Sequence, residues 1–400
     1  MTQERSLLVL AGTRPEFLKL APVIHEIRQT PGLVARTCFS GQHLEILNSV
    51  VGDFDIHPDV DFRAPQQPPR SLSQNLACLI ERIDSAVAQV RPDGVIVQGD
   101  TNTVLAGALV AFHHQIPSFH VEAGLRTSDP NKPFPEEMNR RLVSKMSAIH
   151  FAPTERARQN LLDEGVAPES IEVTGNTGVD ALRIYASKQS PDADAILAKL
   201  RPDTRRVLVT LHRRENASAL EGVIAAVRRL VMTRPNVEVM WILHMNGLRA
   251  QIVDAFASHP SVHLIEPQSY PSFVHLMKAA HIILTDSGGV QEEAPILGKA
   301  ILVLRDETER QEAVEAGSAK LVGCDRDRVL HWCQRLFDEP ALFAHMSEPR
   351  SPFGDGFASR RIVEAFQRFY MLPRRSRRDS VVAKRDLLQR RPHRESAFSL

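Results

Sequence analysis

Short apolar runs alternate with helical patterns along most of the chain, and this alternation restricts the folds open to it. In the first half, the apolar runs at 6–12, 94–100 and 148–154 are each followed by a segment in which apolar residues recur at helical spacing. A strand, a helix and a second strand in succession form a βαβ unit, which builds a parallel sheet covered by helices. The predicted strands of the first half are 6–12, 94–100, 117–124, 148–154 and 171–176.

The same pattern restarts after residues 187–206, which we expect to form a connection with one short helix. The predicted strands of the second half are 206–212, 237–244, 262–267, 281–287 and 300–306. Since 400 residues exceed one hydrophobic core, the chain is expected to form two doubly wound α/β domains. Ligands of such sheets bind beyond the carboxyl ends of the strands, so the cleft between the domains is the expected site.

The charge is nearly balanced, with a net value of +1, but the C-terminal end is basic. From Arg374 onward, Lys and Arg outnumber Asp and Glu by nine to three. The body of the chain carries no basic field, so nucleic acid is not an expected partner. No apolar stretch is long enough to span a membrane and no signal peptide is evident, so we expect a soluble, cytoplasmic protein.

The segment ILTDSGGVQEEAP, residues 283–295, places a glycine turn between a predicted strand and a predicted helix. Gly288 and Gly289 would let backbone N–H groups approach an anion, and Ser287 adds a hydroxyl, although an ordinary tight turn would look the same. The helix is expected to open with Glu292 and Glu293. A carboxylate one turn beyond a diphosphate could accept hydrogen bonds from ribose hydroxyls, so Glu293 indicates a nucleoside diphosphate ligand.

Basic residues follow the first strand of each half. Arg14 and Lys19 follow the strand 6–12, and an arginine at a strand end suits phosphate recognition. His212 ends the strand 206–212 and precedes Arg213, so it faces the same predicted cleft. Solvent exposure would explain Lys19 equally well, and a lone histidine is often structural.

Three acids of the first half are candidates for proton transfer. Asp100 and Glu122 end predicted strands, and Glu136 lies in a segment stiffened by two prolines. Capping or salt bridging would also explain each acid, and Glu136 with Arg140 fits an i,i+4 pair. Crowded together, the three carboxyl groups would raise one another's pKa towards neutrality, where they can exchange protons.

Taken in order, the motifs of the chain resemble those of bacterial non-hydrolysing UDP-N-acetylglucosamine 2-epimerases. The matching strings cover all but about the last 27 residues. They include GTRPEFLKLAP, SGQH, GDTNTVLAGALVAF, HVEAGLRT, PFPEEMNRRL, FAPTE, VTGNTGVDAL, HRREN, LTDSGGVQEEAPILGK, VLRDETERQEAVEAG and FGDGFAS.

The resemblance implies a glycosyltransferase-B-like architecture of two Rossmann-like domains with the active site in the cleft between them. The expected domains are 1–178 and 179–358, with a helix at about 359–373 crossing back to the first domain. Residues 374–400 are expected to be a disordered tail. A homodimer is also implied, and no metal or nicotinamide is required.

The implied reaction is reversible conversion of UDP-N-acetylglucosamine to UDP-N-acetylmannosamine by elimination and re-addition of UDP through 2-acetamidoglucal, for surface polysaccharide synthesis. The positions that match the family's catalytic cluster are Lys19, Asp100, Glu122, Glu136 and His212. The positions that match its nucleotide contacts are Arg14, Gln268, Phe273, Ser287, Gly288, Gly289, Glu293 and Arg310.

Many bacterial members bind a second UDP-N-acetylglucosamine as an activator. The positions that match this second site are Gln42, Arg70, Glu136, Arg213 and His244. Glu45 and Ser71 stand where activated members carry glutamines, so we expect weak or no activation.

Four alternatives remain open from the sequence. The substrate could be a modified sugar such as a UDP-2,3-diacetamido sugar, because Leu211 replaces a glycine common in the family. A glycosyltransferase of the same fold would need an acceptor, and a hydrolysing relative would release free N-acetylmannosamine. A nucleotide-sugar sensor is the non-enzymatic alternative, but crowded carboxylates would bring a sensor no benefit.

Overall fold

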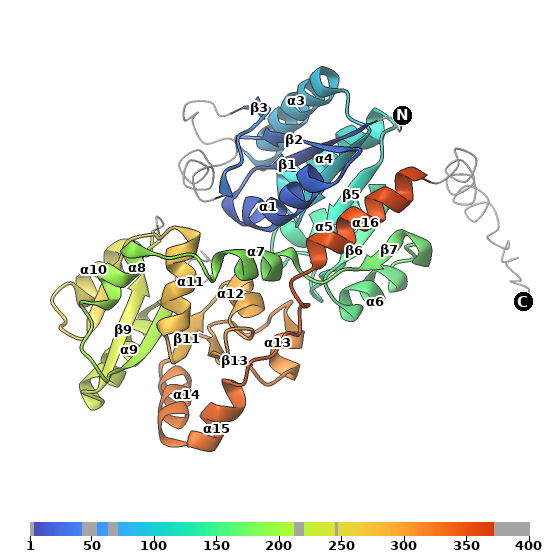
Figure 1. The fold of residues 1–400 in the computed structure, drawn as a ribbon. Helices are drawn as coiled ribbons and strands as arrows, with labels where there is room; N and C mark the ends of the chain where they lie inside the picture. The colour runs from blue at the N-terminus through green and yellow to red at the C-terminus, as the bar shows by residue number, and fades with distance from the viewer. Residues whose placement is uncertain (1–3, 42–53, 63–70, 212–219, 245–246, 372–400) are drawn as a thin grey trace, which may run out of the picture.

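The computed structural model describes residues 4–41, 54–62, 71–211, 220–244 and 247–371, and they form two parallel β-sheets (Figure 1). The first sheet has seven strands and the second has six. Every strand predicted from the sequence coincides with a strand of the structure. The two doubly wound sheets predicted from the alternating pattern are therefore confirmed.

The first sheet has the order β3-β2-β1-β4-β5-β6-β7, with every neighbouring pair parallel. The strand order reverses between β1 and β4, which creates a switch point where ligands of such sheets bind. Its strands are β1 (Arg5–Ala11), β2 (Leu33–Phe39), β3 (Val60–Asp61), β4 (Gly94–Gln98), β5 (Ser118–Val121), β6 (Ile149–Ala152) and β7 (Ile171–Val173). The helices of this half are α1 (Arg14–Gln29), α3 (Leu72–Val90), α4 (Asn102–His113), α5 (Glu136–Met146), α6 (Glu155–Asp163) and α7 (Thr177–Tyr185), with a 3-10 turn at Pro168–Ser170.

The second sheet has the order β10-β9-β8-β11-β12-β13, again parallel throughout, with its switch point between β8 and β11. Its strands are β8 (Arg205–Thr210), β9 (Val237–Ile242), β10 (Val262–Ile265), β11 (Ile282–Thr285), β12 (Ala300–Val303) and β13 (Ala319–Leu321). The helices that follow α7 are α8 (Pro191–Leu197), α9 (Leu220–Thr233), α10 (Arg249–Phe256), α11 (Tyr270–Ala279), α12 (Gly288–Glu293), α13 (Gln311–Glu315), α14 (Arg326–Asp338), α15 (Pro340–Met346) and α16 (Ala358–Met371).

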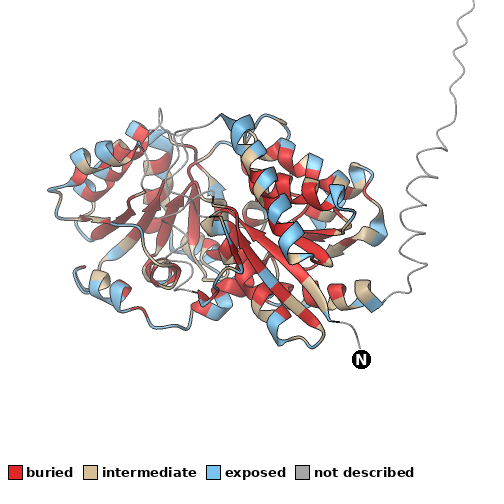
Figure 2. Cartoon of the chain, turned by 90° about the horizontal axis from the view of Figure 1, so that it is seen from above, coloured by how far each residue is buried: buried red, intermediate tan, exposed pale blue. Residues whose placement is uncertain are grey.

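The strands of both sheets are buried and the outer faces of the helices are exposed, as Figure 2 shows. In β1, β4 and β11 most residues are apolar and buried, because helices cover both faces of a doubly wound sheet. Burial on both faces gives strands without polar alternation, which is why these strands were readable from the sequence.

Helix α1 begins where β1 ends, and a capping box fixes that junction. The hydroxyl of Thr13 accepts from the backbone N–H of Glu16, and the carboxylate of Glu16 accepts from the N–H groups of Gly12 and Thr13 at 2.6 and 2.8 Å. The hydroxyl of Thr101 donates to the other oxygen of Glu16. Glu16 therefore joins the turn after β1 to the turn after β4, across the switch point.

Helix α16 returns from the second half to the first, as Figure 1 shows. Phe366 packs against Phe119 and Phe151 of the first sheet, with ring centroids 4.9 and 5.5 Å apart. The backbone N–H of Ser359 donates to Asp180 of α7 at 2.7 Å. The packing agrees with a crossing helix, while the domain limits at 178 and 358 stay predictions.

Candidate active site

Lys19 on α1 lies between carboxylates contributed by the two halves. Its Nζ is 2.5 Å from Oε1 of Glu122 and 2.8 Å from Oε2 of Glu292, and each side chain is at most 7% exposed. Burial alone would lower the pKa of Lys19, but Glu122 and Glu292 outweigh burial and raise it above its ordinary value. Lys19 therefore stays an ammonium ion at the point where the two halves meet.

Glu122 directly follows β5 with its backbone in the left-handed region, at φ 65°. This conformation costs a non-glycine residue about 1 kcal/mol or more, and such strain is concentrated at functional sites. Its Oε2 accepts a hydrogen bond from the amide of Gln98 on β4. Burial raises the pKa of Glu122, Lys19 opposes that shift, and the charge of Glu292 adds to it.

The like charge beside Glu122 is therefore Glu292 of the second half. The sequence predicted crowding among Asp100, Glu122 and Glu136 as the source of a raised pKa. In the structure burial is the main cause of the raised pKa of Glu122, and the neighbouring cations Lys19 and Arg310 act to lower it. The predicted mechanism of the shift is corrected, while its direction holds for Glu122.

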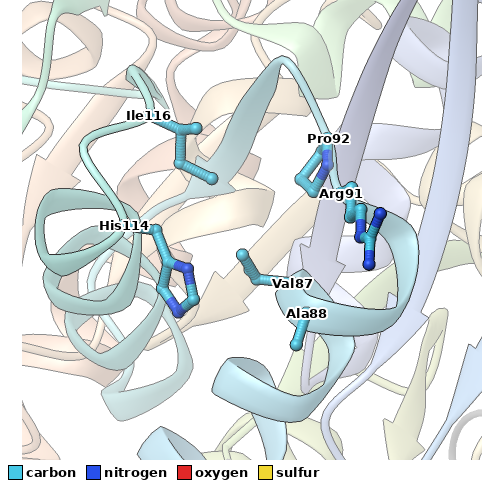
Figure 3. Close-up of a pocket in the computed structure, with 6 residues that line it drawn as sticks. All are labelled: Val87, Ala88, Arg91, Pro92, His114 and Ile116. Atoms are coloured by element: carbon cyan, nitrogen blue, oxygen red, sulfur yellow. The ribbon is translucent and has the colours of Figure 1, made fainter.

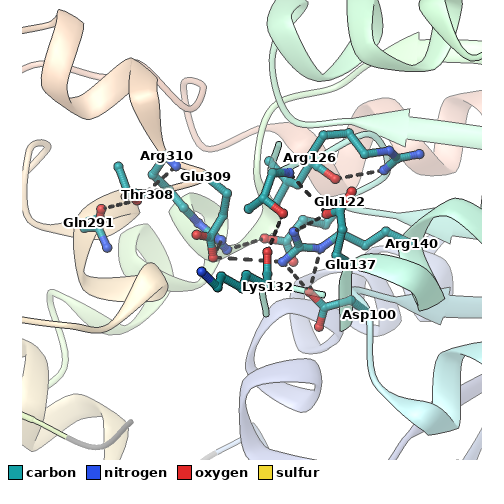
Figure 4. A network of polar contacts seen from close by, with 12 residues as sticks. Asp100, Glu122, Arg126, Lys132, Glu137, Arg140, Gln291, Thr308, Glu309 and Arg310 are labelled. Carbon is teal, nitrogen blue, oxygen red and sulfur yellow. Dashed lines mark hydrogen bonds and ion pairs between the residues drawn. The ribbon is translucent and has the colours of Figure 1, made fainter. Parts of the chain in front are cut away.

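Arg310 precedes α13 and joins three carboxylates, of which Figure 4 shows Glu122 and Glu309. Its guanidinium is 2.9 Å from Glu292, 2.5 Å from Glu309 and 3.3 Å from Glu122. Burial acts to lower the pKa of Arg310, but the three carboxylates raise it further than burial lowers it. One guanidinium from the second half thus contacts acids from both halves.

Asp100 lies at the carboxyl end of β4 and pairs with Arg140 of α5 (Figure 4). Nε and Nη2 of Arg140 lie 2.8 and 2.7 Å from the same oxygen, Oδ2 of Asp100. Asn139 donates to the backbone carbonyl of Asp100 at 2.9 Å. Helix α5 therefore fixes both the backbone and the side chain of Asp100.

The glycine turn follows β11 as predicted, with Ser287 as the residue before helix α12. The helix begins at Gly288, so Glu292 and Glu293 lie at its end and not in its first turn, which corrects the sequence-based expectation. A Cβ at Gly288 would lie 2.9 Å from the guanidinium carbon of Arg310. The absence of a side chain at Gly288 is therefore what lets Arg310 pass over the turn.

Glu293 is buried, and a hydrogen bond joins it to Tyr270 of α11. Burial raises the pKa of Glu293 to about 8, the charge of Glu292 adds to the shift, and Lys19 opposes it. Near neutral pH this carboxyl group therefore carries a proton for much of the time.

Two further predicted residues meet across the halves. Nη2 of Arg14 donates to the backbone carbonyl of Gln268 at 2.8 Å. Phe273 lies on α11 and is half-buried against the core. Glu136 is the first residue of α5, and His244 follows β9. The structure thus places these positions, and their proposed roles stay predictions.

Five predicted positions lie outside the described residues. They are Gln42, Glu45, Arg70, His212 and Arg213.

Four polar residues of the cluster were not singled out by sequence reasoning as functional. They are Gln98, Arg140, Glu292 and Glu309. Glu292 was noticed but given no role. The signal that could have identified these residues is charge balance, because a buried carboxylate needs a buried cation as its partner.

A separate hollow of about 400 Å³ opens between α3 and α4, as Figure 3 shows. It is lined by Val87, Ala88, Arg91, Pro92, His114 and Ile116. These residues flank the starts of β4 and β5, at the amino end of the sheet. The clustered residues Lys19, Asp100 and Glu122 lie towards the opposite, carboxyl end, where ligands of doubly wound sheets bind, so this hollow is not the candidate active site.

Comparison with known proteins links this geometry to a family. Residues 25–367 match the family model described as UDP-N-acetylglucosamine 2-epimerase. The chain is 42% identical over 370 residues to the UDP-N-acetylglucosamine 2-epimerase of Escherichia coli O157:H7, covering 90% of this chain and 98% of that protein. It is 41% identical over 360 residues to the enzyme of the same name from Bacillus subtilis strain 168, covering 90% and 94%.

Solved structures agree with these matches. A UDP-GlcNAc 2-epimerase of Neisseria meningitidis bound to UDP-GlcNAc aligns with a TM-score of 0.88 and 40% identity, covering 91% of this chain and 100% of that chain. The enzyme of Methanocaldococcus jannaschii in complex with UDP-GlcNAc and UDP aligns with a TM-score of 0.80 and 34% identity, covering 90% and 99%. In the part of the chain that the structure describes, no helix is long and apolar enough to cross a membrane. The chain belongs to the UDP-N-acetylglucosamine 2-epimerase family, which is a family of isomerases.

Proposed function

We propose that the chain interconverts UDP-N-acetylglucosamine and UDP-N-acetylmannosamine by inverting C2 of the sugar. The observation that carries this proposal is the buried cluster of Lys19, Glu122, Glu292 and Arg310 between the two sheets. The cluster combines cations suited to a diphosphate with a carboxyl group whose pKa is raised. Names and titles of similar proteins, including two solved with UDP-GlcNAc, support the choice of substrate.

The nucleotide is proposed to bind mainly to the second half. Arg310 and the turn at Ser287, Gly288 and Gly289 would hold the diphosphate, with Arg14 reaching across from the first half. The ribose would lie against Glu293 of α12, near Gln268 and Phe273. The contact between Arg14 and the carbonyl of Gln268 supports this arrangement, because it already joins the two sides of the proposed nucleotide site.

The chemistry is proposed to occur on the first half. A carboxylate takes the C2 proton, the C1–O bond breaks, and UDP leaves with the bonding electrons, so that 2-acetamidoglucal forms. A carboxylic acid then returns a proton to the opposite face of C2 while UDP adds again to C1. Asp100, Glu122 and Glu136 are the proposed proton carriers, with Lys19 and His212 stabilising the departing charge.

Proton NMR of the purified protein with UDP-GlcNAc in D₂O tests the proposal. We expect the manno isomer to accumulate with deuterium at C2, without any acceptor. Product that forms only with an acceptor would indicate a glycosyltransferase, and free N-acetylmannosamine with UDP would indicate a hydrolysing enzyme. A manno isomer that keeps its original C2 proton would rule out exchange through the proposed carboxylates.

We also propose that the protein is a homodimer joined through α4 and α5. These helices pack together and share an apolar outer face. Phe112, Met138 and Leu142 are 63%, 43% and 45% exposed, and Leu105 and Leu109 continue the stripe on α4. Such a face is typical of a subunit contact. Light scattering of the Leu142→Glu variant should show a monomer, and a dimer of unchanged affinity would contradict this assignment.

We propose that activation by a second UDP-GlcNAc is weak or absent. Ser71 replaces an expected glutamine, and its hydroxyl caps α3 by accepting from the backbone N–H of Gln74 at 3.2 Å. The serine side chain is shorter than that of glutamine, and its hydroxyl is already used in capping the helix. Ser71 therefore extends less far from α3 than a glutamine amide would. UDP-ManNAc alone should be converted promptly, and a long lag removed by trace UDP-GlcNAc would refute the proposal.

The similarity to the family also underlies our proposal of a cytoplasmic role in surface polysaccharide synthesis.

A further inference from the structure

Arg140 holds Asp100 in an unusual way. The side chain of Arg140 is 5% exposed, and both Nε and Nη2 lie within 2.8 Å of Oδ2 of Asp100. Oδ1 of Asp100 makes no hydrogen bond to any other part of the chain that the structure describes. The side chain of Asp100 is 27% exposed, so one oxygen is anchored while the carboxylate keeps access to the cleft.

The remaining contacts of Arg140 lead to the second half. Its Nη1 lies 3.1 Å from Glu137 of α5, and its Nη2 lies 3.9 Å from Oε1 of Glu309. Glu309 is 1% exposed and also binds Arg310 at 2.5 Å and Arg305 at 2.8 Å. A continuous path of opposite charges therefore runs from Asp100 through Arg140 and Glu309 to Arg310 (Figure 4).

Arg310 is the residue proposed above to hold the diphosphate, and it also contacts Glu122 at 3.3 Å. The path thus connects both strand-end carboxylates with the proposed nucleotide site. A diphosphate on Arg310 would compete with the carboxylates for that guanidinium. Glu309 would then depend more on Arg140 and Arg305, which draws Arg140 and the Asp100 it holds towards the second half.

We infer that Arg140 is a positioning residue that orients Asp100 as a carboxylate for proton transfer at C2 and links that orientation to occupancy of Arg310. The inference rests on the proposed epimerase function and names a residue that acts through Asp100. Arginine suits this role because its planar fork offers several donors in fixed directions. A lysine would keep the positive charge but would bind Asp100 through one ammonium group on a flexible side chain.

Several charged groups surround this pair. His120, Arg310 and Glu309 act on Arg140 and Asp100 from β5 and the second half, and Glu137 acts from α5. His120 is buried next to the backbone carbonyl of Gly99, and burial lowers its pKa to about 4. Among the described charged groups, Arg140 is the cation that binds the side chain of Asp100 directly.

Arg141 provides a matched control on the same helix. Its Nε binds Glu137 at 2.9 Å, as Arg140 binds Glu137, but its described ion pairs include neither Asp100 nor Glu309. Glu137 keeps one arginine in either single variant, and it also accepts from the N–H of Thr127. The two substitutions thus remove one guanidinium each from the same buried carboxylate and differ in the link to Asp100.

The experiment compares wild type, Arg140→Met, Arg140→Lys and Arg141→Met in epimerisation of UDP-GlcNAc, with Tm measured for each. Arg140→Met should lower kcat about 100-fold and change KM less than about threefold, because the substrate contacts remain while the carboxylate of Asp100 loses its orientation. Arg140→Lys should recover part of that loss and leave kcat about tenfold below wild type. Arg141→Met should stay within about threefold of wild type.

Equal kcat losses in Arg140→Met and Arg141→Met, or a loss confined to KM, would overturn the inference. If Arg140→Met fails to fold, Arg140→Lys provides the test. A wild-type kcat in Arg140→Lys would contradict the inference, because it would show that Asp100 does not require the guanidinium group of Arg140. Wild-type protein that makes no manno isomer would refute the proposed function itself, which separates the two failures.

Discussion

The two sides of the cleft share a strand order and differ in chemistry. In both sheets the strand order reverses beside the first strand, and both place candidate site residues at the carboxyl ends of strands. The first half contributes acids at two strand ends, Asp100 and Glu122, together with Lys19 and Arg140 from helices. The second half contributes a glycine turn, Glu293 and Arg310. The same architecture thus presents the proposed proton carriers on one side and the proposed nucleotide contacts on the other.

The difference also shows how the two sides depend on each other. Glu292 belongs to the second half, yet Lys19 of the first half is one of its two cations. Glu122 belongs to the first half, yet Arg310 of the second half contacts it at 3.3 Å. Breaking a buried ion pair by removing one partner costs about 3–5 kcal/mol, so these contacts favour approach of the halves.

The largest expected effect is a difference in reaction rate between variants of Glu122 and Glu292, the two carboxylates that both contact Lys19 and Arg310. Glu122→Gln should lower the rate of deuterium incorporation at C2 about 1,000-fold, because an amide cannot carry the proton. Glu292→Gln removes a similar charge from the same two cations but should cost only about tenfold. Proton NMR in D₂O measures both rates under identical conditions.

Equal losses in the two variants would break the comparison, since they would mean that charge balance alone explains both effects. Their Tm values serve as the control, because both substitutions leave a buried cation with one carboxylate fewer. A Glu292→Gln variant more damaged than Glu122→Gln would move the proton chemistry to the second half.

Much of the fold could be predicted because buried parallel strands are continuous apolar runs. Strand β2 was not among the predicted strands, since Arg36 and Thr37 interrupt its apolar pattern. Thr37 is buried because Asp59 accepts from its backbone N–H at 2.8 Å, a partner 22 residues away that no local pattern reveals. Predictions from periodicity therefore hold where both faces are apolar and fail where a distant partner satisfies a polar residue.

The same reasoning explains which site residues could be predicted. Asp100 and Glu122 were identified by their position, because the ends of parallel strands meet at one edge. Arg140 lies within a helix and Glu309 within a loop. Neither position in the sequence indicates a site residue, as the end of a predicted strand does. Arg310 was assigned through resemblance alone. Their role becomes visible only when the partner of each buried charge is known.

A second, smaller effect is expected at the glycine turn. In Gly288→Ala the new Cβ would lie 2.9 Å from the guanidinium carbon of Arg310, while in Gly289→Ala it would meet its nearest neighbours at 3.9 Å. Gly288→Ala should therefore displace Arg310 and weaken UDP binding about tenfold, the cost of one charged hydrogen bond. Gly289→Ala should weaken binding less. Titration calorimetry with UDP measures both, and equal losses would show that the backbone of the turn, and not Arg310, dominates the contact.

The smallest expected effect compares one buried carboxyl group from each side. Burial raises the pKa of Glu16 from 4.5 to about 7 and that of Glu293 from 4.5 to about 8. The folded protein therefore binds these protons more tightly than the unfolded chain does. Each group lowers the free energy of unfolding as pH rises from about 4.5 to its folded pKa, by at most about 3 kcal/mol for Glu16 and about 5 kcal/mol for Glu293.

Glu16 is already about half ionised at pH 7, whereas Glu293 still holds most of its proton there, so Glu293 makes the larger contribution between pH 7 and 8. Glu293→Gln should remove part of the fall in Tm between pH 7 and 8, by a few degrees, whereas Glu16→Gln should act mainly on the interval below pH 7. Thermal unfolding at pH 5, 7 and 8 measures these differences. A Glu293→Gln variant whose Tm falls as steeply as wild type above pH 7 would show that Glu293 ionises freely, as a carboxylate solvated within the cleft would.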